Sequence, residues 1–259
     1  MFGQHEGLMY LEYLTHFKYN IEFFYINTYH APFSNIENIM ISFLAILIIA
    51  YLLGSISPSI LISRWIKGVD IRTYGSGNAG MTNAIRLLGG RWGAVVAIID
   101  ILKGLISSLW LTDALYSAFD ATPLEITLVR ILAAIAAVAG HIWTIFFGFK
   151  GGKGVLTMAG AVLGVAPLPV GICFATFILI FALTRYVSLG SIIGSWVFPI
   201  VVFIQRFVLQ QSVSDYLLGF SIFVMVLITF THRENIRRLM RGEEKKFGAA
   251  KSATPNQAV

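Results

Sequence analysis

The sequence predicts an all-α integral membrane protein with seven transmembrane helices, and its composition is the first reason. Hydrophobic residues make up 57% of the 259 residues and charged residues only 12%, whereas soluble domains average about 45–50% and about 25%. So few ionisable side chains cannot cover a surface in water, which excludes a soluble enzyme. The single cysteine, Cys173, lies in an apolar run and cannot form a disulfide within the chain.

The second reason is the spacing of the apolar runs, since a spanning helix needs about 20 mainly apolar residues. Pro167 and Pro169 interrupt the uncharged run at 154–184 and would end a helix there, so we expect two short crossings, the fourth and fifth. A re-entrant hairpin in this run would preserve the same orientation of the other helices. The expected crossings are residues 39–62, 92–112, 126–147, 154–166, 168–184, 187–205 and 215–231.

The third reason is that Lys and Arg gather in alternate loops. The loop at 63–91 is rich in Arg and Lys, the loop at 113–125 has acids and no basic residue, and the tail after 231 is strongly basic. The positive-inside rule then places the N-terminus outside and the C-terminus in the cytoplasm. This makes the chain a multi-pass membrane protein. The net charge of +6 therefore indicates anionic lipid and loop orientation, with no nucleic-acid partner.

The chain divides into three parts. Residues 1–37 form a leader whose aromatic residues recur at helical spacing from Tyr10 to Phe24, which suits an amphipathic helix in the headgroup region. Alternatively, the leader is not part of the native product, which would then start at Met40. We expect residues 38–244 to form the seven-span domain and residues 245–259 to be a disordered basic tail.

The first polar segment, residues 74–86, is rich in glycine and ends in an arginine. Its glycines allow positive φ and can aim successive N–H groups at one anion. The arginine adds a planar donor fork suited to phosphate. A glycine turn that merely opens a short helix is the alternative. The candidate ligands are Ser76, Asn78, Thr82, Asn83 and Arg86.

The second segment, residues 149–154, places Lys153 among Gly151, Gly152 and Gly154 just before a helix. Free N–H groups at a helix start, beside a lysine, suit a phosphate. The spacing is not that of a Walker loop, so a nucleotide site is not predicted. A basic loop that only satisfies the positive-inside rule remains the alternative.

The third segment, residues 232–239, follows the last crossing. His232 and Asn235 share a helical face nearest the membrane; a basic helix touching anionic lipid is the alternative.

Within the spans, Asp100 and Lys103 can pair at i, i+3. His141 lies near the cytoplasmic end of the third span, where a lone histidine commonly bonds between helices.

These three segments, in this order and spacing, resemble the motifs of the bacterial acyl-phosphate:glycerol-3-phosphate acyltransferase family of integral membrane enzymes, over about residues 44–244. The resemblance implies transfer of a fatty acyl group from acyl phosphate to the 1-hydroxyl of sn-glycerol 3-phosphate. The products are lysophosphatidate and phosphate, in phospholipid synthesis. It implies no metal and no cofactor, a location in the cell inner membrane, and an active site that faces the cytoplasm. The implied partners are acyl phosphate, glycerol 3-phosphate, membrane lipids and the enzyme that supplies acyl phosphate.

The resemblance and the residue chemistry together suggest roles for the polar positions. Either His232 or a substrate phosphate could accept the hydroxyl proton, and the sequence leaves this open. The expected catalytic residues are Ser76, Lys153 and His232; the expected substrate-binding residues are Asn78, Thr82, Asn83, Arg86, His141, Gly151, Gly152, Gly154 and Asn235.

Two other classes of protein fit parts of the pattern. A transporter of a phosphorylated anion would also need cationic, glycine-rich loops, but the two halves show no inverted repeat with matching broken segments. A lipid-binding scaffold with basic loops would not need Ser76, Asn78 and Asn83 in one turn.

Overall fold

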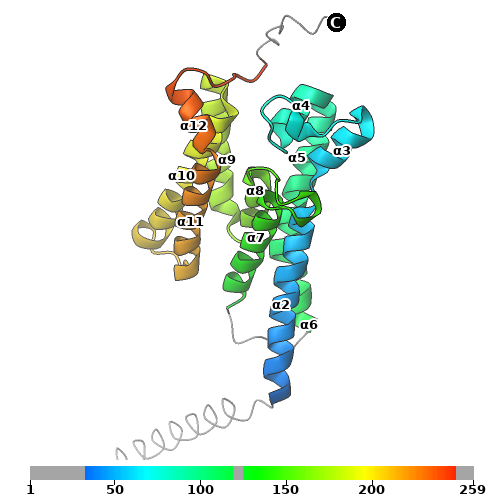
Figure 1. The fold of residues 1–259 in the computed structure, drawn as a ribbon. Coiled ribbons are helices and arrows are strands. Elements are labelled where there is room, and N and C mark those ends of the chain that lie inside the picture. Colours follow the sequence, from blue (N-terminus) through cyan, green and yellow to red (C-terminus); the bar gives the residue numbers. More distant parts are fainter. Residues whose placement is uncertain (1–32, 119–124, 249–259) are drawn as a thin grey trace, which may run out of the picture. The chain divides into compact units, whose positions relative to one another are not determined.

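The computed structural model describes residues 33–118 and 125–248, with side chains from Met40 onward. The regular secondary structure of these residues is entirely helical, with no β-strand among them (Figure 1). The chain divides into two compact units, Met1–Phe43 and Leu44–Val259, and all the polar segments belong to the second. The amphipathic helix expected between Tyr10 and Phe24 lies outside the described residues.

The helices from residue 90 onward lie close to the expected crossings, whereas the first expected crossing, residues 39–62, is interrupted between Ser55 and Pro58. Two π-helical segments, Ile106–Leu111 and Ile204–Val208, extend α5 and α10. The helices are α2 (Phe33–Ser55), α3 (Pro58–Lys67), α4 (Met81–Leu88), α5 (Gly90–Leu105), α6 (Thr112–Ala118), α7 (Ile126–Ile142), α8 (Val155–Leu163), α9 (Pro167–Thr184), α10 (Val187–Phe203), α11 (Asp215–Thr231) and α12 (Arg233–Met240).

Five helical segments in the described part of the chain are long and apolar enough to cross a membrane. The pair α11 and α12, bent by 61°, would make a sixth if it counts as one span. The other five are Met40–Lys67, Gly90–Tyr116, Ile126–Phe147, Pro167–Thr184 and Val187–Val208. The structure thus has an integral membrane architecture, while the count of seven and the orientation stay predictions.

The fourth expected crossing is where the count differs. α8 has nine residues, which span about 14 Å at 1.5 Å per residue, less than half of a hydrocarbon core about 30 Å thick. The break after it falls where the prolines predicted it. α9 begins at Pro167, because proline at the first helical position loses no hydrogen bond.

Among the described residues, two of the groups of buried apolar residues surround the polar segments. One lies among α7, α8, α10 and α11 and includes Val138, Val202 and Phe220. The other, which we call the α4 cluster, joins α3, α4 and α5. It consists of Ile60, Ile71, Ala79, Ala84 and Val96.

A close crossing of α5 and α8 brings polar side chains of different helices together. A Cβ on Gly104 would lie 2.0 Å from the carbonyl oxygen of Thr157, and one on Gly160 would lie 2.0 Å from that of Ile101. Only glycine permits this approach, as is common where membrane helices pack. The crossing sets the Asp100–Lys103 turn of α5 against the start of α8.

Candidate active site

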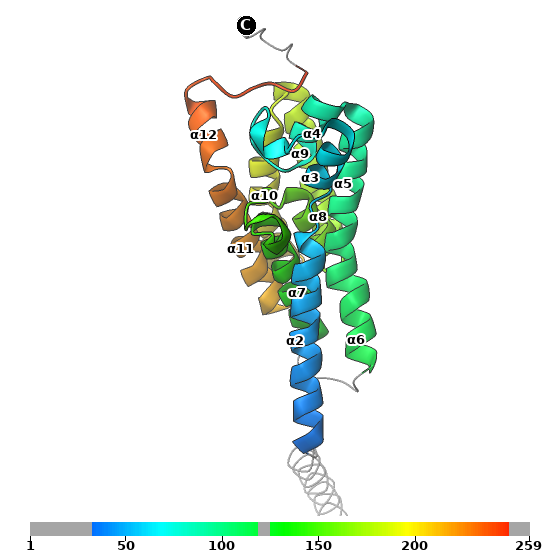
Figure 2. The same cartoon turned by 45° about the vertical axis from the view of Figure 1, so that its right-hand side comes forward.

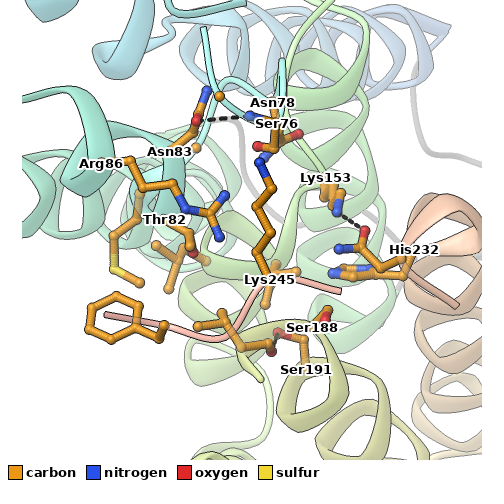
Figure 3. A pocket seen from close by; sticks show the side chains of 18 of the residues that line it. Ser76, Asn78, Thr82, Asn83, Arg86, Lys153, Ser188, Ser191, His232 and Lys245 are labelled. Atoms are coloured by element: carbon orange, nitrogen blue, oxygen red, sulfur yellow. Dashed lines mark hydrogen bonds between the residues drawn. The ribbon is translucent and has the colours of Figure 1, made fainter. Parts of the chain in front are cut away.

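The three polar segments, far apart in the sequence, line one cavity of about 400 Å³ (Figure 3). The convergence that the sequence analysis expected is therefore present. Every candidate site residue borders the cavity except Gly151 and Gly152. The candidates that line it are Ser76, Asn78, Thr82, Asn83, Arg86, His141, Lys153, Gly154, His232 and Asn235.

The glycine turn of the first segment is built around the side chain of Asn83. Its amide nitrogen donates to the carbonyls of Ile71 (3.0 Å) and Tyr74 (2.8 Å), and its oxygen accepts from the Ser76 N–H at 3.2 Å. A Cβ on Gly75, whose φ is +61°, would lie 2.4 Å from that oxygen. The side chain of Asn83 is thus buried and holds the turn together through hydrogen bonds within the protein. The sequence had predicted instead a side chain free to bind substrate.

Other polar groups of the first segment remain available. The side chains of Ser76, Asn78, Thr82 and Arg86 line the cavity, and none has a hydrogen bond or ion pair within the described ranges. Figure 3 shows the guanidinium of Arg86 extending from α4 toward the cavity. This wall can therefore offer one cationic fork and several uncharged polar groups to an anion.

Arg72, which was not among the residues predicted from the sequence, forms a clamp between the first loop and the second. Arg72 donates to the carbonyls of Phe147 (2.7 Å) and Lys150 (2.9 Å), and pairs with Asp70 at 2.8 Å. The hydrogen bond from Arg72 holds the pKa of Asp70 well below its usual value, against the opposing effect of burial. An Asp two residues before an Arg is a weak signal, and only the fold reveals the carbonyls that it captures.

The second segment differs from the expected phosphate cradle. The N–H groups of Gly151 and Gly152 already donate to the carbonyls of Ile142 (3.0 Å) and His141 (3.1 Å). A Cβ on Gly151 would lie 1.9 Å from the His141 carbonyl oxygen, and one on Gly152 would lie 2.2 Å from His141 Nε2. These two glycines therefore allow close packing, with their N–H groups bonded within the protein, and their expected role in binding substrate stays a prediction.

The lysine of this segment does reach the cavity. Lys153 Nζ donates to the side-chain oxygen of Asn235, so the second and third segments meet directly. Burial lowers the pKa of Lys153 to about 8; Arg238 and Arg86 add to this shift and Glu244 opposes it. A partly desolvated ammonium beside other cations gains from the arrival of an anion.

His141 belongs to a buried network below the lysine loop. Lys103 Nζ donates to His141 Nδ1 and to the Ile56 carbonyl, each at 2.8 Å, and pairs with Asp100 at 2.8 Å. Thr157 Oγ1 lies 3.2 Å from the same nitrogen. An ammonium only donates, so Nδ1 accepts from Lys103 when that lysine is charged; Asp100 Oδ1 lies 3.4 Å from the same nitrogen. Its side chain borders the cavity, but its bonds join helices, which argues against the substrate-binding role we expected.

His232, at the junction of α11 and α12, presents an acceptor to the cavity. Its Nδ1 lies 2.8 Å from the Ile228 carbonyl, and a carbonyl can only accept, so Nδ1 carries the proton. Burial, with a contribution from the charge of Lys153, lowers the pKa of His232 to about 4. The ring is therefore neutral near pH 7, and Nε2 carries a lone pair.

Several residues that line the cavity were not predicted. Ser188 and Ser191 lie at the start of α10, Arg238 lies in α12, and Glu244 and Lys245 follow that helix. Two serines at i, i+3 just after a basic residue at a span end were the available signal for the first pair. Residues 245–248 pack back on the protein, where Phe247 N–H donates to the Arg185 carbonyl at 2.8 Å. This differs from the disordered tail that we expected from residue 245; residues 249–259 lie outside the described ranges.

An apolar wall completes the cavity. Val155, Leu156, Phe177 and Val187 line it beside the polar groups. A cavity that is cationic on one side and hydrocarbon on the other suits a ligand with a charged head and an apolar tail.

Comparison with known proteins agrees with this chemistry. A family model described as glycerol-3-phosphate acyltransferase matches residues 44–242. The glycerol-3-phosphate acyltransferase of Chlorobaculum tepidum is 42% identical over 231 residues, which cover 80% of this chain and 97% of the relative. That of Chlorobium luteolum is 40% identical over 240 residues, which cover 83% and 100%.

Two solved structures are similar throughout the same region. The crystal structure of PlsY, an integral membrane glycerol 3-phosphate acyltransferase, in its glycerol 3-phosphate form has a TM-score of 0.69 and 39% identity, and covers 80% of this chain and 96% of that one. Its lysophosphatidic acid form has a TM-score of 0.67. The chain therefore belongs to the glycerol-3-phosphate acyltransferase family of integral membrane enzymes.

Proposed function

We propose that this enzyme transfers a fatty acyl group from an acyl phosphate to the 1-hydroxyl of sn-glycerol 3-phosphate, giving lysophosphatidate and inorganic phosphate. The observation that carries the proposal is one cavity that combines Arg86, Lys153 and a neutral His232 with an apolar wall. The similar structures are a glycerol 3-phosphate form and a lysophosphatidic acid form, which supports the acceptor and the product.

The cations address the main obstacle to this reaction, which is repulsion between two phosphorylated substrates. Each singly substituted phosphate group, on the ester and on the acyl phosphate alike, carries a charge of about −1.5 to −2 at pH 7. In the proposal, Lys153 binds the phosphate that departs, and Arg86 with Ser76 and Asn78 binds that of glycerol 3-phosphate. Holding both molecules in line can supply about 7–11 kcal/mol of the barrier.

The bond changes need no covalent enzyme intermediate, because an acyl phosphate is already activated. The hydroxyl oxygen attacks the acyl carbonyl carbon, the bond from that carbon to the phosphate oxygen breaks, and phosphate leaves with the electron pair. Lys153 stabilises the negative charge on the leaving oxygen. Removing one such donor typically lowers kcat by about 100- to 1,000-fold.

The protonation state of His232 bears on which group takes the hydroxyl proton. A base with a pKa of about 4 is weaker than a phosphate, whose second pKa is about 6. We therefore assign the proton to a substrate phosphate oxygen, and to His232 Nε2 the role of accepting a hydrogen bond that orients the hydroxyl. Asn235, which accepts a hydrogen bond from Lys153, would position Lys153 and His232 relative to each other.

The membrane setting follows from the apolar wall and the helices. We propose seven crossings in the inner membrane with the cavity on the cytoplasmic side, as the distribution of Lys and Arg favours. The acyl tail would then remain in lipid while its phosphate meets water-soluble glycerol 3-phosphate. A reporter fused to the C-terminus should be found in the cytoplasm, and an external signal would refute this orientation.

Purified protein in detergent, mixed with palmitoyl phosphate and labelled glycerol 3-phosphate, tests the reaction. We expect lysophosphatidate and phosphate to form in equal amounts. If neither product forms and liposomes carrying the protein accumulate labelled glycerol 3-phosphate, the enzyme proposal fails in favour of a transporter.

A further inference from the structure

The segment after α12, residues 243–248, crosses back toward the junction of α9 and α10 and borders the cavity; we call it the C-terminal strap (Figure 2). The helix ends where Glu243 N–H donates to the Arg238 carbonyl at 2.8 Å. The far end is held at α9, where the ring of Phe247 meets that of Phe181 edge-on, with centroids 5.4 Å apart. The strap lies just beyond the region that the family model matches.

One carboxylate fixes the strap at the cavity. Glu244 Oε1 accepts from Ser188 Oγ (2.7 Å) and Asn235 Nδ2 (2.6 Å), and Oε2 pairs with Arg238 Nε at 2.7 Å. Its side chain is only 10% exposed. Burial opposes ionisation, but the hydrogen bonds outweigh it and hold the pKa of Glu244 below its usual value. The strap is therefore tied to both α10 and α12 by an ionised side chain.

Fixing Glu244 also fixes the direction of the next side chain. Figure 3 shows Lys245 extending from the strap into the cavity toward Ser76 and Asn78. Within the described residues its ammonium has no hydrogen bond and no ion pair, although it borders the same cavity as Arg86 and Lys153. Arg238 is already neutralised by Glu244, so Lys245 is the additional uncompensated cation here.

We propose that Lys245 is a substrate phosphate-binding residue of this site and that Glu244 is the positioning residue that delivers it; the inference rests on the proposed function. Two substrate phosphates would bring a charge of about −3 to −4 at pH 7. Arg86 and Lys153 offset only two charges of that total, which leaves anionic charge for a third cation to neutralise. Because Lys245 extends toward the turn proposed to hold glycerol 3-phosphate, that substrate is its partner.

Steady-state kinetics of three variants test this role. Lys245→Met should raise KM for glycerol 3-phosphate by about 10-fold, the low end expected for losing a charge-assisted hydrogen bond, with kcat within about 3-fold, since the group binds the substrate without joining in bond breaking. Lys245→Arg, which keeps the charge, should recover most of the loss. The matched control is Lys246→Met, because Lys246 lies on the same strap but 5.7 Å over the ring of Tyr186, so its kinetics should match wild type.

The outcomes separate the inference from the reaction that it assumes. A rise in KM for acyl phosphate instead would support a phosphate-binding Lys245 and reverse the substrate assignment. Wild-type kinetics in Lys245→Met, or equal losses in the Lys245 and Lys246 variants, would overturn the role while leaving the acyltransferase intact. Higher kcat/KM in Glu244→Gln would overturn it too, since the carboxylate would then be an inhibitor. No product from wild type would remove the proposed function and this inference together.

Discussion

The two walls of the cavity are built in different ways. The wall formed by α3, α4 and their loop rests on the buried α4 cluster, and its central polar side chain, Asn83, has its bonds within the wall itself. The opposite wall, from α10, α12 and the strap, is joined by one carboxylate that connects Ser188, Asn235 and Arg238.

This difference separates stability from binding. A buried amide with every bond made costs folding free energy when it is lost, because its partners stay buried and unpaired. The ion pair of Glu244 with the partly exposed Arg238 should contribute less to stability, but it can set where a ligand-binding group lies. We therefore expect loss of a side chain that is fully bonded within the first wall to lower stability, and loss of the carboxylate of the second wall to alter kinetics with the fold intact.

Lys153 lies between the two walls, and its replacement should give the largest effect. Lys153→Met should lower kcat by at least about 100-fold, since it removes the cation proposed to stabilise the departing phosphate. The rate is measured at saturating concentrations of both substrates. Lys150→Met is the matched control, because Lys150 is exposed in the same loop and does not border the cavity. A Lys153→Met rate within a few-fold of wild type would remove this lysine from the chemistry.

The first wall is tested by Asn83→Leu against Asn78→Ala. Leucine would leave the carbonyls of Ile71 and Tyr74 and the N–H of Ser76 without a partner, so we expect a loss of about 2–4 kcal/mol in unfolding free energy. Thermal unfolding in detergent measures it as a lower Tm. Asn78→Ala, in the same turn, should keep the wild-type Tm and raise KM. Equal Tm values for the two variants would contradict the division of roles.

The pH dependence of kcat/KM tests whether the charge of Lys153, between the two walls, is needed for activity. Lys153 is charged below its pKa of about 8 and neutral above it, so kcat/KM, which reports groups of the free enzyme, should fall above about pH 8. Lys153→Arg keeps its charge and should move that fall to higher pH. Because the pKa of His232 is about 4, no loss centred near pH 6.5 should come from the enzyme. If the loss of kcat/KM at high pH is unchanged in Lys153→Arg, that loss belongs to the titration of another group.

The smallest expected effect is on the stability of the second wall. Glu244→Gln can keep an acceptor oxygen for Ser188 and Asn235. It loses the ion pair between Glu244, which is 10% exposed, and Arg238, which is 38% exposed and can turn to water, so the unfolding free energy should change by about 1 kcal/mol, less than for Asn83→Leu. Chemical unfolding in detergent compares it with wild type. A loss as large as that of Asn83→Leu would show that both walls are structural in the same way.

Much of this molecule could be predicted locally. The ends of α9, α10 and α11 fall within two residues of the expected crossings, because hydropathy and proline act within one helix. The polar segments were identified for the same reason, since Gly75 and Lys153 have unusual immediate neighbours. The clamp by Arg72 could not be found in this way, because its carbonyl partners lie far along the chain.

The sequence by itself determined where the apolar helices lie, where prolines break them and which three segments carry polar chemistry, since these properties depend on adjacent residues. Only the tertiary structure decided how each polar group is used. In the folded protein Asn83 and Gly152 pack and bond within the protein, whereas Arg86 is open to the cavity. The fold also places Glu244 within hydrogen-bond distance of Ser188. The physical reason is that a hydrogen-bonding group is available to a ligand only if no distant part of the chain has already satisfied it.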